Sequence, residues 1–152
     1  MTGSVVSLQI VPGNHAPPRF VEEAQPIQGG GLEDDWHRKH QRRALLLMDA
    51  GDLWDLGLSP GDLREQITVD LPGLMDLRSG TRLRIGDALI EITKECAPCT
   101  HIGEHVGVDD VETFRDHLQG RRGMLATFVQ ADPEVPIRVG DRVEVVVEER
   151  AS

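Results

Sequence analysis

The chain has 152 residues, of which 39% are hydrophobic, 28% charged and 3% aromatic, and these values are typical of one soluble globular domain over residues 1–152. Its formal net charge of −10 argues against general nucleic-acid binding, which needs a positive surface, and the few aromatic rings leave little stacking area for single strands. No run approaches the roughly 20 apolar residues of a membrane span, and the first residues lack the basic and apolar regions of a signal peptide, so we expect a cytoplasmic protein.

Short β-strands dominate the predicted elements. Residues 4–11 alternate well enough for a first strand, which ends at Pro12 and Gly13. Residues 12–35 contain four prolines and three consecutive glycines, which predicts a long, loop-rich connection. The other predicted strands are apolar or rich in Val, Ile and Thr and are bounded by Gly, Pro and Asp; they span residues 43–48, 66–71, 81–86, 88–93, 126–131 and 141–149.

Two short helices are predicted among these strands. Asp49 opens the first, over residues 52–56, and Gly57 closes it. Asp109 is expected to cap the second, which ends at Gly120. Short strands at this spacing, with so few helices, predict a mostly-β fold that forms a barrel or a strongly coiled sheet.

Both cysteines of the chain lie in the segment ECAPCTH, residues 95–101, and two are too few for a disulfide framework. A zinc clip would use Cys96, Cys99, His101 and His105, which are ligands of the right type, but no second, distant ligand pair would tie two elements together. A redox dithiol would need a βαβ setting, which the β-rich remainder does not supply. The remaining alternatives are two small buried apolar residues, or one reactive thiol beside a bystander.

Four segments of the chain resemble, in order, the motifs of one family. GLEDDWHRKHQRRALLLM resembles a G-x-x-x-D-x-H segment that leads into a strand, and GLSPGDLREQITVDLPGL resembles an R-E-N-hydrophobic-T-V-x-G-L stretch. GTRLRIGDALIEITKECAPC is similar to a strand pair that leads to a pocket cysteine, and GMLATFVQADPEVPIRVGDRVEVV to the final strands of a barrel. Together they resemble the MOSC domain family, a module related to the C-terminal domain of molybdenum cofactor sulfurases. The resemblance implies a MOSC-type β-barrel with one essential cysteine in a pocket.

The resemblance also implies roles for the two cysteines. The working cysteine of the family corresponds to the second one in C-x-x-C, which is Cys99 here, whereas only some relatives have a cysteine at the position of Cys96. Relatives use this thiolate toward sulfur or toward the molybdenum of the pterin cofactor, so Cys99 is also the expected metal ligand for a molybdenum cofactor (molybdopterin). Gln66 stands where the family usually has Asn, and its longer side chain changes the reach of the amide.

Cationic side chains are the candidates for holding a pterin phosphate and for favouring a thiolate. They gather at Arg42 and Arg43, at Arg64 in the R-E-Q motif, and at Arg122 in a turn flanked by glycines. The alternative for any one of them is a surface ion pair with the 26 acidic residues of the chain. Arg64 is the strongest candidate because it lies in a matched motif.

Histidines and two acidic residues complete the set of candidates. An extended D-W-H stretch would place Asp35 and His37 on one side and Trp36 on the other, either toward a ligand or as a structural pair. His101 would share one face with Cys99 if the preceding strand continued. The residues expected to act chemically are Cys99, His101 and His37, and those expected to bind the cofactor are Arg64, Glu65, Gln66, Asp35, Arg42, Arg43 and Arg122.

Two functions follow from the resemblance. In the first, the domain is a carrier whose Cys99 holds persulfide sulfur or the molybdenum cofactor and passes it to a molybdoenzyme, with sulfur supplied by a separate pyridoxal-phosphate-dependent desulfurase. In the second, molybdenum at Cys99 reduces N-hydroxylated bases or amidoximes, with electrons from a separate flavin or iron–sulfur reductase. No nucleotide-binding fingerprint appears, so no nucleotide cofactor is expected. A zinc-clipped interaction domain is the third alternative, and a monomer or homodimer is expected.

Overall fold

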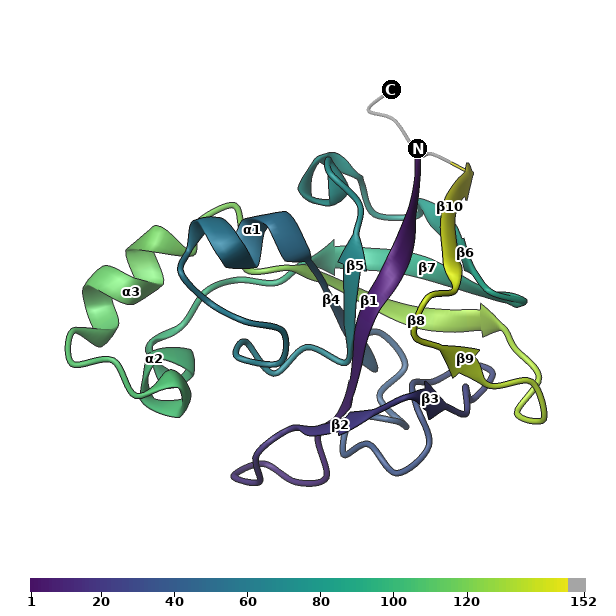
Figure 1. Ribbon diagram of the computed structural model, residues 1–152, viewed down its shortest axis with the longest axis horizontal. Coiled ribbons are helices and arrows are strands. Elements are labelled where there is room, and N and C mark those ends of the chain that lie inside the picture. Colours follow the sequence, from purple (N-terminus) through teal and green to yellow (C-terminus); the bar gives the residue numbers. More distant parts are fainter. Residues whose placement is uncertain (148–152) are drawn as a thin grey trace.

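The computed structural model describes residues 1–147, and most of its strands form one curved sheet that closes into a barrel (Figure 1). The strands are β1 (Thr2–Ile10), β2 (Arg19–Val21), β3 (Glu23–Ala24), β4 (Leu45–Asp49), β5 (Ile67–Asp70), β6 (Arg82–Ile85), β7 (Ala88–Glu95), β8 (Met124–Gln130), β9 (Ile137–Arg138) and β10 (Arg142–Val147). The helices are α1 (Ala50–Asp55), α2 (Thr100–Val106) and α3 (Val111–His117), with a 3-10 turn at Leu74–Asp76. The mostly-β barrel predicted from the sequence is confirmed; residues 148 and 149 of the last predicted strand lie outside the described residues.

The barrel contains seven strands in the order β10-β6-β7-β8-β4-β5-β1, and β1 pairs with β10 to close the ring. The closing register joins Thr2 to Glu144 and Ser4 to Arg142. β4 and β5 are parallel, which requires a crossover connection, and α1 with the loop after it provides one. β2 extends the sheet beyond β1, and β3 pairs with β9 in a separate two-stranded sheet.

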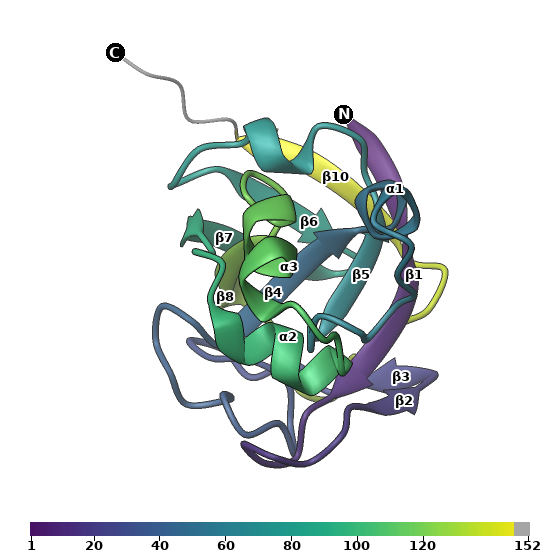
Figure 2. The same cartoon turned by 90° about the vertical axis from the view of Figure 1, so that its left-hand side faces the viewer.

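Apolar side chains from the barrel strands fill its interior, among them Phe128, Leu8, Leu47 and Ile67, each with 0% exposure. A second apolar cluster lies outside the barrel, where the three helices cover one side of it (Figure 2). This cluster consists of Met48, Leu53, Leu63, Ile102 and Leu118. Because β4 is covered on both faces, all five of its residues are buried and its sequence is a continuous apolar run that ends at Asp49.

Helix caps account for the boundaries of α1 and α3. The Asp49 carboxylate accepts a hydrogen bond from the Asp52 amide at 3.3 Å, as the sequence predicted, and a second from the Leu71 amide at 2.9 Å. The prediction that Asp109 caps α3 is wrong. Asp110 does so, accepting from the Thr113 amide at 3.0 Å, because α3 begins one residue later than predicted.

The sequence did not predict α2, and the continuing strand that would have placed His101 and Cys99 on one face does not form. β7 ends at Glu95, and Pro98, which has no amide hydrogen to donate, stands in the link to the helix. α2 then packs closely on α3, since a Cβ built on Gly103 would lie 3.0 Å from a Val111 methyl group. No helix within the described part of the chain has the length and apolar character needed to cross a membrane.

Candidate functional site

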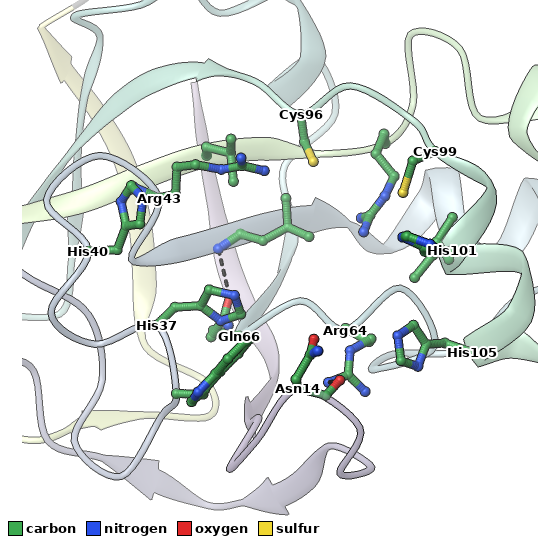
Figure 3. A pocket seen from close by; sticks show the side chains of 15 residues that line it. Asn14, His37, His40, Arg43, Arg64, Gln66, Cys96, Cys99, His101 and His105 are labelled. Carbon is green, nitrogen blue, oxygen red and sulfur yellow. Dashed lines mark hydrogen bonds between the residues drawn. The ribbon is translucent and has the colours of Figure 1, made fainter.

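A cavity of about 570 Å³ opens beside the barrel, where α2 and the loops before β4, β5 and β8 meet the segment after β7 (Figure 3). Its wall is formed by side chains from widely separated parts of the sequence. The lining residues are Asn14, Trp36, His37, His40, Arg43, Leu46, Arg64, Gln66, Cys96, Cys99, His101, Ile102, His105, Arg122 and Leu125.

The charge of this cavity is opposite to that of the chain. The lining contains three arginines and four histidines but no aspartate or glutamate, although the chain as a whole carries a net charge of −10. A concave wall with one sign of charge concentrates counter-ions, and guanidinium groups suit phosphates and carboxylates. The charge of the lining therefore favours an anionic over a cationic ligand.

Arg122 is the most deeply buried cation of the cavity, with 8% of its surface exposed. Its Nε and Nη1 atoms are buried, and neither has a hydrogen-bond partner within the described part of the chain. A buried donor without a partner costs roughly 1–3 kcal/mol, and more when it is charged. Arg122 also lines the cavity, so its positive charge would attract an anionic ligand there.

Gly123 fixes the turn that carries Arg122. Its φ is +109°, and a Cβ at this position would lie 2.6 Å from the Leu47 carbonyl oxygen, so only glycine fits against β4. The Gly123 carbonyl oxygen accepts a hydrogen bond from the Cys96 amide at 2.9 Å. The same turn therefore positions both the buried cation and the start of the cysteine segment.

Both cysteines are free and line the cavity, and Figure 3 shows their sulfur atoms on its upper wall. Cys99 is exposed and is the N-cap residue of α2, where its side chain makes no capping hydrogen bond. Cys96 has 6% exposure and packs in a small apolar cluster with Leu46 and Leu125. Of the two thiols, Cys99 is thus the one that a ligand or a reagent can reach.

The alternatives for the cysteine pair find little support in this geometry. Within the described part of the chain, no group of three or more His, Cys, Asp or Glu side chains is arranged to hold a metal ion, so the four proposed zinc ligands do not form a clip. A dithiol in a βαβ unit is also absent from the described residues, because β7 is followed by α2, α3 and the antiparallel strand β8.

Asp35 and Gln66 form a hydrogen-bonded network behind the cavity wall. The Asp35 carboxylate is fully buried and accepts from the Val11 amide at 2.8 Å, from the His37 amide at 2.9 Å and from Gln66 Nε2 at 3.3 Å. Gln66 Oε1 in turn accepts from the Leu46 amide at 2.7 Å. The longer amide of Gln66 therefore bridges the loop before β4 to β4 itself.

Trp36 and His37 both line the cavity, so the prediction that they face opposite sides is wrong. The segment is a turn, because the His37 amide donates to the Asp35 carboxylate and the Arg38 amide donates to the Asp35 carbonyl. The two rings meet edge to face at 5.0 Å. His37 Nδ1 lies 3.6 Å from Asp35 Oδ2 and makes no hydrogen bond to any described residue.

Arg64 lines the cavity and also fastens the loop after β1. Its Nη1 donates to the Ala16 carbonyl at 2.8 Å, and its Nη2 donates to the carbonyls of Gly13 and Asn14 at 3.0 Å each. Its backbone has φ of +62°, which is uncommon for a residue with a side chain. Partial burial lowers the pKa of Arg64 from its ordinary value. The contacts of Arg64 are thus partly structural, and they bring Asn14 into the cavity wall.

Three of the residues expected to bind the cofactor do not line the cavity: Asp35, Glu65 and Arg42. Glu65 is fully buried and its Oε2 accepts from the Gly61 amide and the Thr68 hydroxyl; burial raises the pKa of this carboxyl. The Arg42 side chain is exposed outside the lining, while its carbonyl oxygen accepts from the Thr93 hydroxyl. The other expected residues, Cys99, His101, His37, Arg64, Gln66, Arg43 and Arg122, come together in the cavity.

The sequence missed the contributions of Asn14, Trp36, His40 and His105 to this wall. His105 lies four residues after His101, so both are on one face of α2, and this spacing becomes informative only once a helix is known. The ring of His105 lies 6.3 Å from that of His15. Burial, together with the charges of Arg64 and His15, lowers the pKa of His105. Arg64 and His105 also border a second cavity of about 250 Å³.

Several solved structures share this fold. The crystal structure of YuaD from Bacillus subtilis is 20% identical with a TM-score of 0.82, over 95% of this chain and 96% of that one. YiiM from Escherichia coli is 21% identical with a TM-score of 0.67, over 100% and 72% of the two chains. YiiM from Geobacillus stearothermophilus is 18% identical with a TM-score of 0.69, over 95% and 75%. At these identities the likeness shows a common fold.

Comparison of sequences identifies the family, whereas the similarity of structures shows only the fold. No curated protein sequence matches the chain. The sequence profile of the MOSC domain, however, matches residues 33–144, a range that includes β4 to β8, α2 and all but one of the cavity residues. The order of motifs, the barrel and the cysteine at the cavity all agree with this match. The chain belongs to the MOSC domain family.

Proposed function

We propose that this protein binds the molybdenum cofactor in its cationic cavity, with Cys99 as the attachment thiol. The family is associated with molybdenum cofactor binding. The observation that carries the proposal is the combination of an exposed thiol with the buried cation Arg122, whose Nε and Nη1 have no hydrogen-bond partner among the described residues, in a cavity lined by no carboxylate from those residues.

The residues of the cavity suit the chemistry of this cofactor. A thiolate is a soft ligand for a transition metal, and Cys99 is the exposed thiol of the cavity. A pterin phosphate needs charge-assisted donors, and Arg122 and Arg43 supply guanidinium groups of the kind that bind phosphate in pairs of hydrogen bonds. When bound, the cofactor would supply oxygen-atom or sulfur transfer at its molybdenum.

Side chains around Cys99 would supply hydrogen bonds and exclude water. His101 and His37 line the same cavity, and their ring nitrogens can donate or accept hydrogen bonds there. Leu46, Leu125 and Ile102 form the apolar part of the lining and would exclude water from the thiol. Gln66 keeps its place through hydrogen bonds to Leu46 and Asp35, and so would hold one side of the ligand in a fixed position.

The load on Cys99 defines two versions of this function, and the exposure of its thiol serves both. As a carrier, the protein would accept persulfide sulfur from a separate desulfurase, or the cofactor itself, and pass it to a molybdoenzyme. As a reductase, it would act on N-hydroxylated bases or amidoximes and would need a separate flavin or iron–sulfur protein as the electron donor. We favour the carrier, because cationic side chains and a reachable thiol are sufficient to hold a load, whereas the reductase also needs a separate electron donor.

Loading experiments on the two cysteine variants test the proposal. Protein made in molybdate-supplied cells is assayed for molybdenum, for oxidised pterin fluorescence and for cyanide-labile sulfur. We expect Cys99→Ser to abolish the load and Cys96→Ser to retain most of it. Folding should survive in Cys99→Ser, because serine is a favourable N-cap residue for α2.

Alkylation of the unloaded protein gives an independent measure. Iodoacetamide should modify the exposed Cys99 well before Cys96, which has 6% exposure. A fully loaded Cys99→Ser variant would refute the proposal. Equal loss from both variants, together with release of zinc, would instead revive the zinc clip.

A further inference from the structure

We propose that the cavity recognises a ligand that joins an anionic group to a flat conjugated ring, and that Trp36 is the surface on which this ring stacks. The inference deepens the proposed function and rests on it for the choice of ring, a pterin. Trp36 itself is identified by its exposure, its fixed backbone and its place in the cavity wall.

Trp36 leaves half of its surface, 50%, exposed while lining the cavity. Large aromatic rings are scarce in this chain, which has two tryptophans, three phenylalanines and no tyrosine. An exposed indole forgoes a large hydrophobic gain, and a stacked ring would recover it along with the preference of aromatic pairs for offset contact. The position of Trp36 on a ligand-sized cavity therefore indicates a planar partner.

The backbone around Trp36 is held in place before any ligand arrives. The Trp36 amide donates to the Val11 carbonyl at 2.8 Å, and the neighbouring Asp35 carboxylate fixes Val11 and His37 through their amides. Arg38 adds a hydrogen bond from its Nη1 to the Asp35 carbonyl at 3.0 Å. A preorganised aromatic wall loses little entropy when a ring packs on it, and this raises affinity.

The arrangement of the wall sets the shape of the ligand. In Figure 3, His37 lies across the cavity from Cys99, with His40 and Arg43 on the same side as His37. The Trp36 ring adjoins that of His37 at 5.0 Å. A ligand attached at Cys99 would thus extend across the cavity and place its ring beside Trp36, among the cationic side chains.

Exposure alone does not identify a ring-binding residue, and Trp54 shows the difference. Trp54 has 64% exposure but lies at the end of α1 and lines neither of the two cavities described above. It is a matched control, because both tryptophans are exposed and only Trp36 belongs to the cavity.

Calorimetry and fluorescence of a single-tryptophan protein test the inference. In Trp54→Phe, emission comes from Trp36 alone, and the protein is titrated with neopterin monophosphate, guanosine monophosphate, ribose 5-phosphate and inorganic phosphate. We expect neopterin monophosphate to bind most tightly and to quench Trp36, whereas ribose 5-phosphate binds more weakly and leaves the emission unchanged. Trp36→Ala should weaken neopterin monophosphate binding by roughly 5- to 100-fold, the range of base–aromatic stacking, and leave ribose 5-phosphate binding within about twofold. Trp36→Phe should retain most of the affinity.

Each other outcome counts against a defined part of the inference. Equal affinity for neopterin monophosphate and ribose 5-phosphate, or an unchanged affinity in a folded Trp36→Ala variant, overturns the stacking role. Tighter binding of guanosine monophosphate overturns the pterin while supporting the stacked ring. These titrations use metal-free ligands and are repeated in Cys99→Ser. If the Trp36 effect persists while no protein loads molybdenum or sulfur, the proposed function fails and the ring site stands.

Discussion

Two buried polar groups beside the cavity differ sharply in how their hydrogen bonds are satisfied. The Asp35 carboxylate has 0% exposure and accepts from Val11, His37 and Gln66. Arg122 has 8% exposure, and its Nε and Nη1 have no partner within the described residues. The protein itself satisfies the Asp35 carboxylate, and this network holds the wall together. It leaves two donors of Arg122 without a hydrogen bond among the described residues, and the charge of Arg122 acts on the buried Glu65 carboxylate, whose Oε1 also has no partner there.

The largest change in the free energy of unfolding should come from breaking the hydrogen-bond network of Asp35. Asp35→Ala leaves the Val11 and His37 amides and the Gln66 side chain without their buried acceptor. We expect the free energy of unfolding to fall by about 3–5 kcal/mol, measured by urea denaturation. Glu33→Ala, at a neighbouring exposed position, should change it by less than about 0.5 kcal/mol. A loss below about 1 kcal/mol in Asp35→Ala would mean that the network is not structural.

The second prediction concerns the turn that carries Arg122. Gly123→Ala forces a side chain into φ of +109° and places its Cβ 2.6 Å from the Leu47 carbonyl oxygen, and we expect a loss of about 2–4 kcal/mol. Gly120→Ala, at φ of +76° with open space around it, isolates the backbone cost and should lose about 1 kcal/mol. Equal losses in urea denaturation would show that the close approach to β4 is unimportant.

Arg122→Met gives the sharpest test of the comparison. Removing a guanidinium whose Nε and Nη1 have no hydrogen-bond partner among the described residues should lower the free energy of unfolding less than Asp35→Ala does, although it also removes the cation that lowers the pKa of buried Glu65. The variant should, however, lose the rise in melting temperature that phosphate or a phosphate ester gives the parent protein. Arg121→Met is the control and should keep that rise in melting temperature. In the parent protein, Arg121 Nη2 donates a hydrogen bond to the His117 carbonyl. A strongly destabilised Arg122→Met protein would show that Arg122 has a structural partner.

The smallest effect is expected for His105, whose pKa is lowered by burial and by Arg64 and His15. Below the unfolded-state pKa of about 6.5, the unfolded chain takes up a proton at this histidine more readily than the folded protein does. Stability should therefore fall as the pH drops from about 6.5 through the lower folded pKa, and His105→Gln should remove this part of the dependence. Thermal denaturation from pH 5 to 8 measures it.

A bound anion should act on His105 in the opposite direction. Negative charge in the cavity favours the protonated imidazole, so phosphate affinity should increase as the pH falls through the pKa of His105. Isothermal titration of phosphate at pH 5.5 and 7.5 tests this linkage in the parent protein and in His105→Gln. The same pH dependence in both proteins would assign it to another histidine or to the phosphate itself.

The barrel was predictable from the sequence because its strands are short, apolar and bounded by turn residues. Residues 88–93, for example, are mostly apolar, follow Gly86 and Asp87 directly, and form all but the last two residues of β7. α2 was not predictable, because only Ile102 and Val106 carry an apolar helical spacing and Gly103 lowers the helix propensity. The helix is stabilised by its packing on α3 and on the apolar cluster outside the barrel, which the local sequence does not encode.

The cavity residues were likewise only partly predictable from the sequence. Cys99, His37 and Arg64 lie in motifs and were found from them, whereas Asn14 enters the wall because Arg64, 50 residues away, binds its carbonyl. The side on which Trp36 lies depends on the turn that the hydrogen bonds of the His37 and Arg38 amides form. The sequence predicted an extended D-W-H stretch, which would place Trp36 on the wrong side. Contacts between distant segments thus decided what the local pattern left open.

The seam between β1 and β10 has a consequence for the order of events during synthesis. Thr2 pairs with Glu144, so the first barrel strand to leave the ribosome must wait for the last before the ring can close. At bacterial and eukaryotic elongation rates this delay is on the order of ten seconds. During that time the inner faces of β1 and β5 remain available to chaperones, and the cavity has no settled shape. If the cavity carries the proposed load, loading should therefore follow the synthesis of β10.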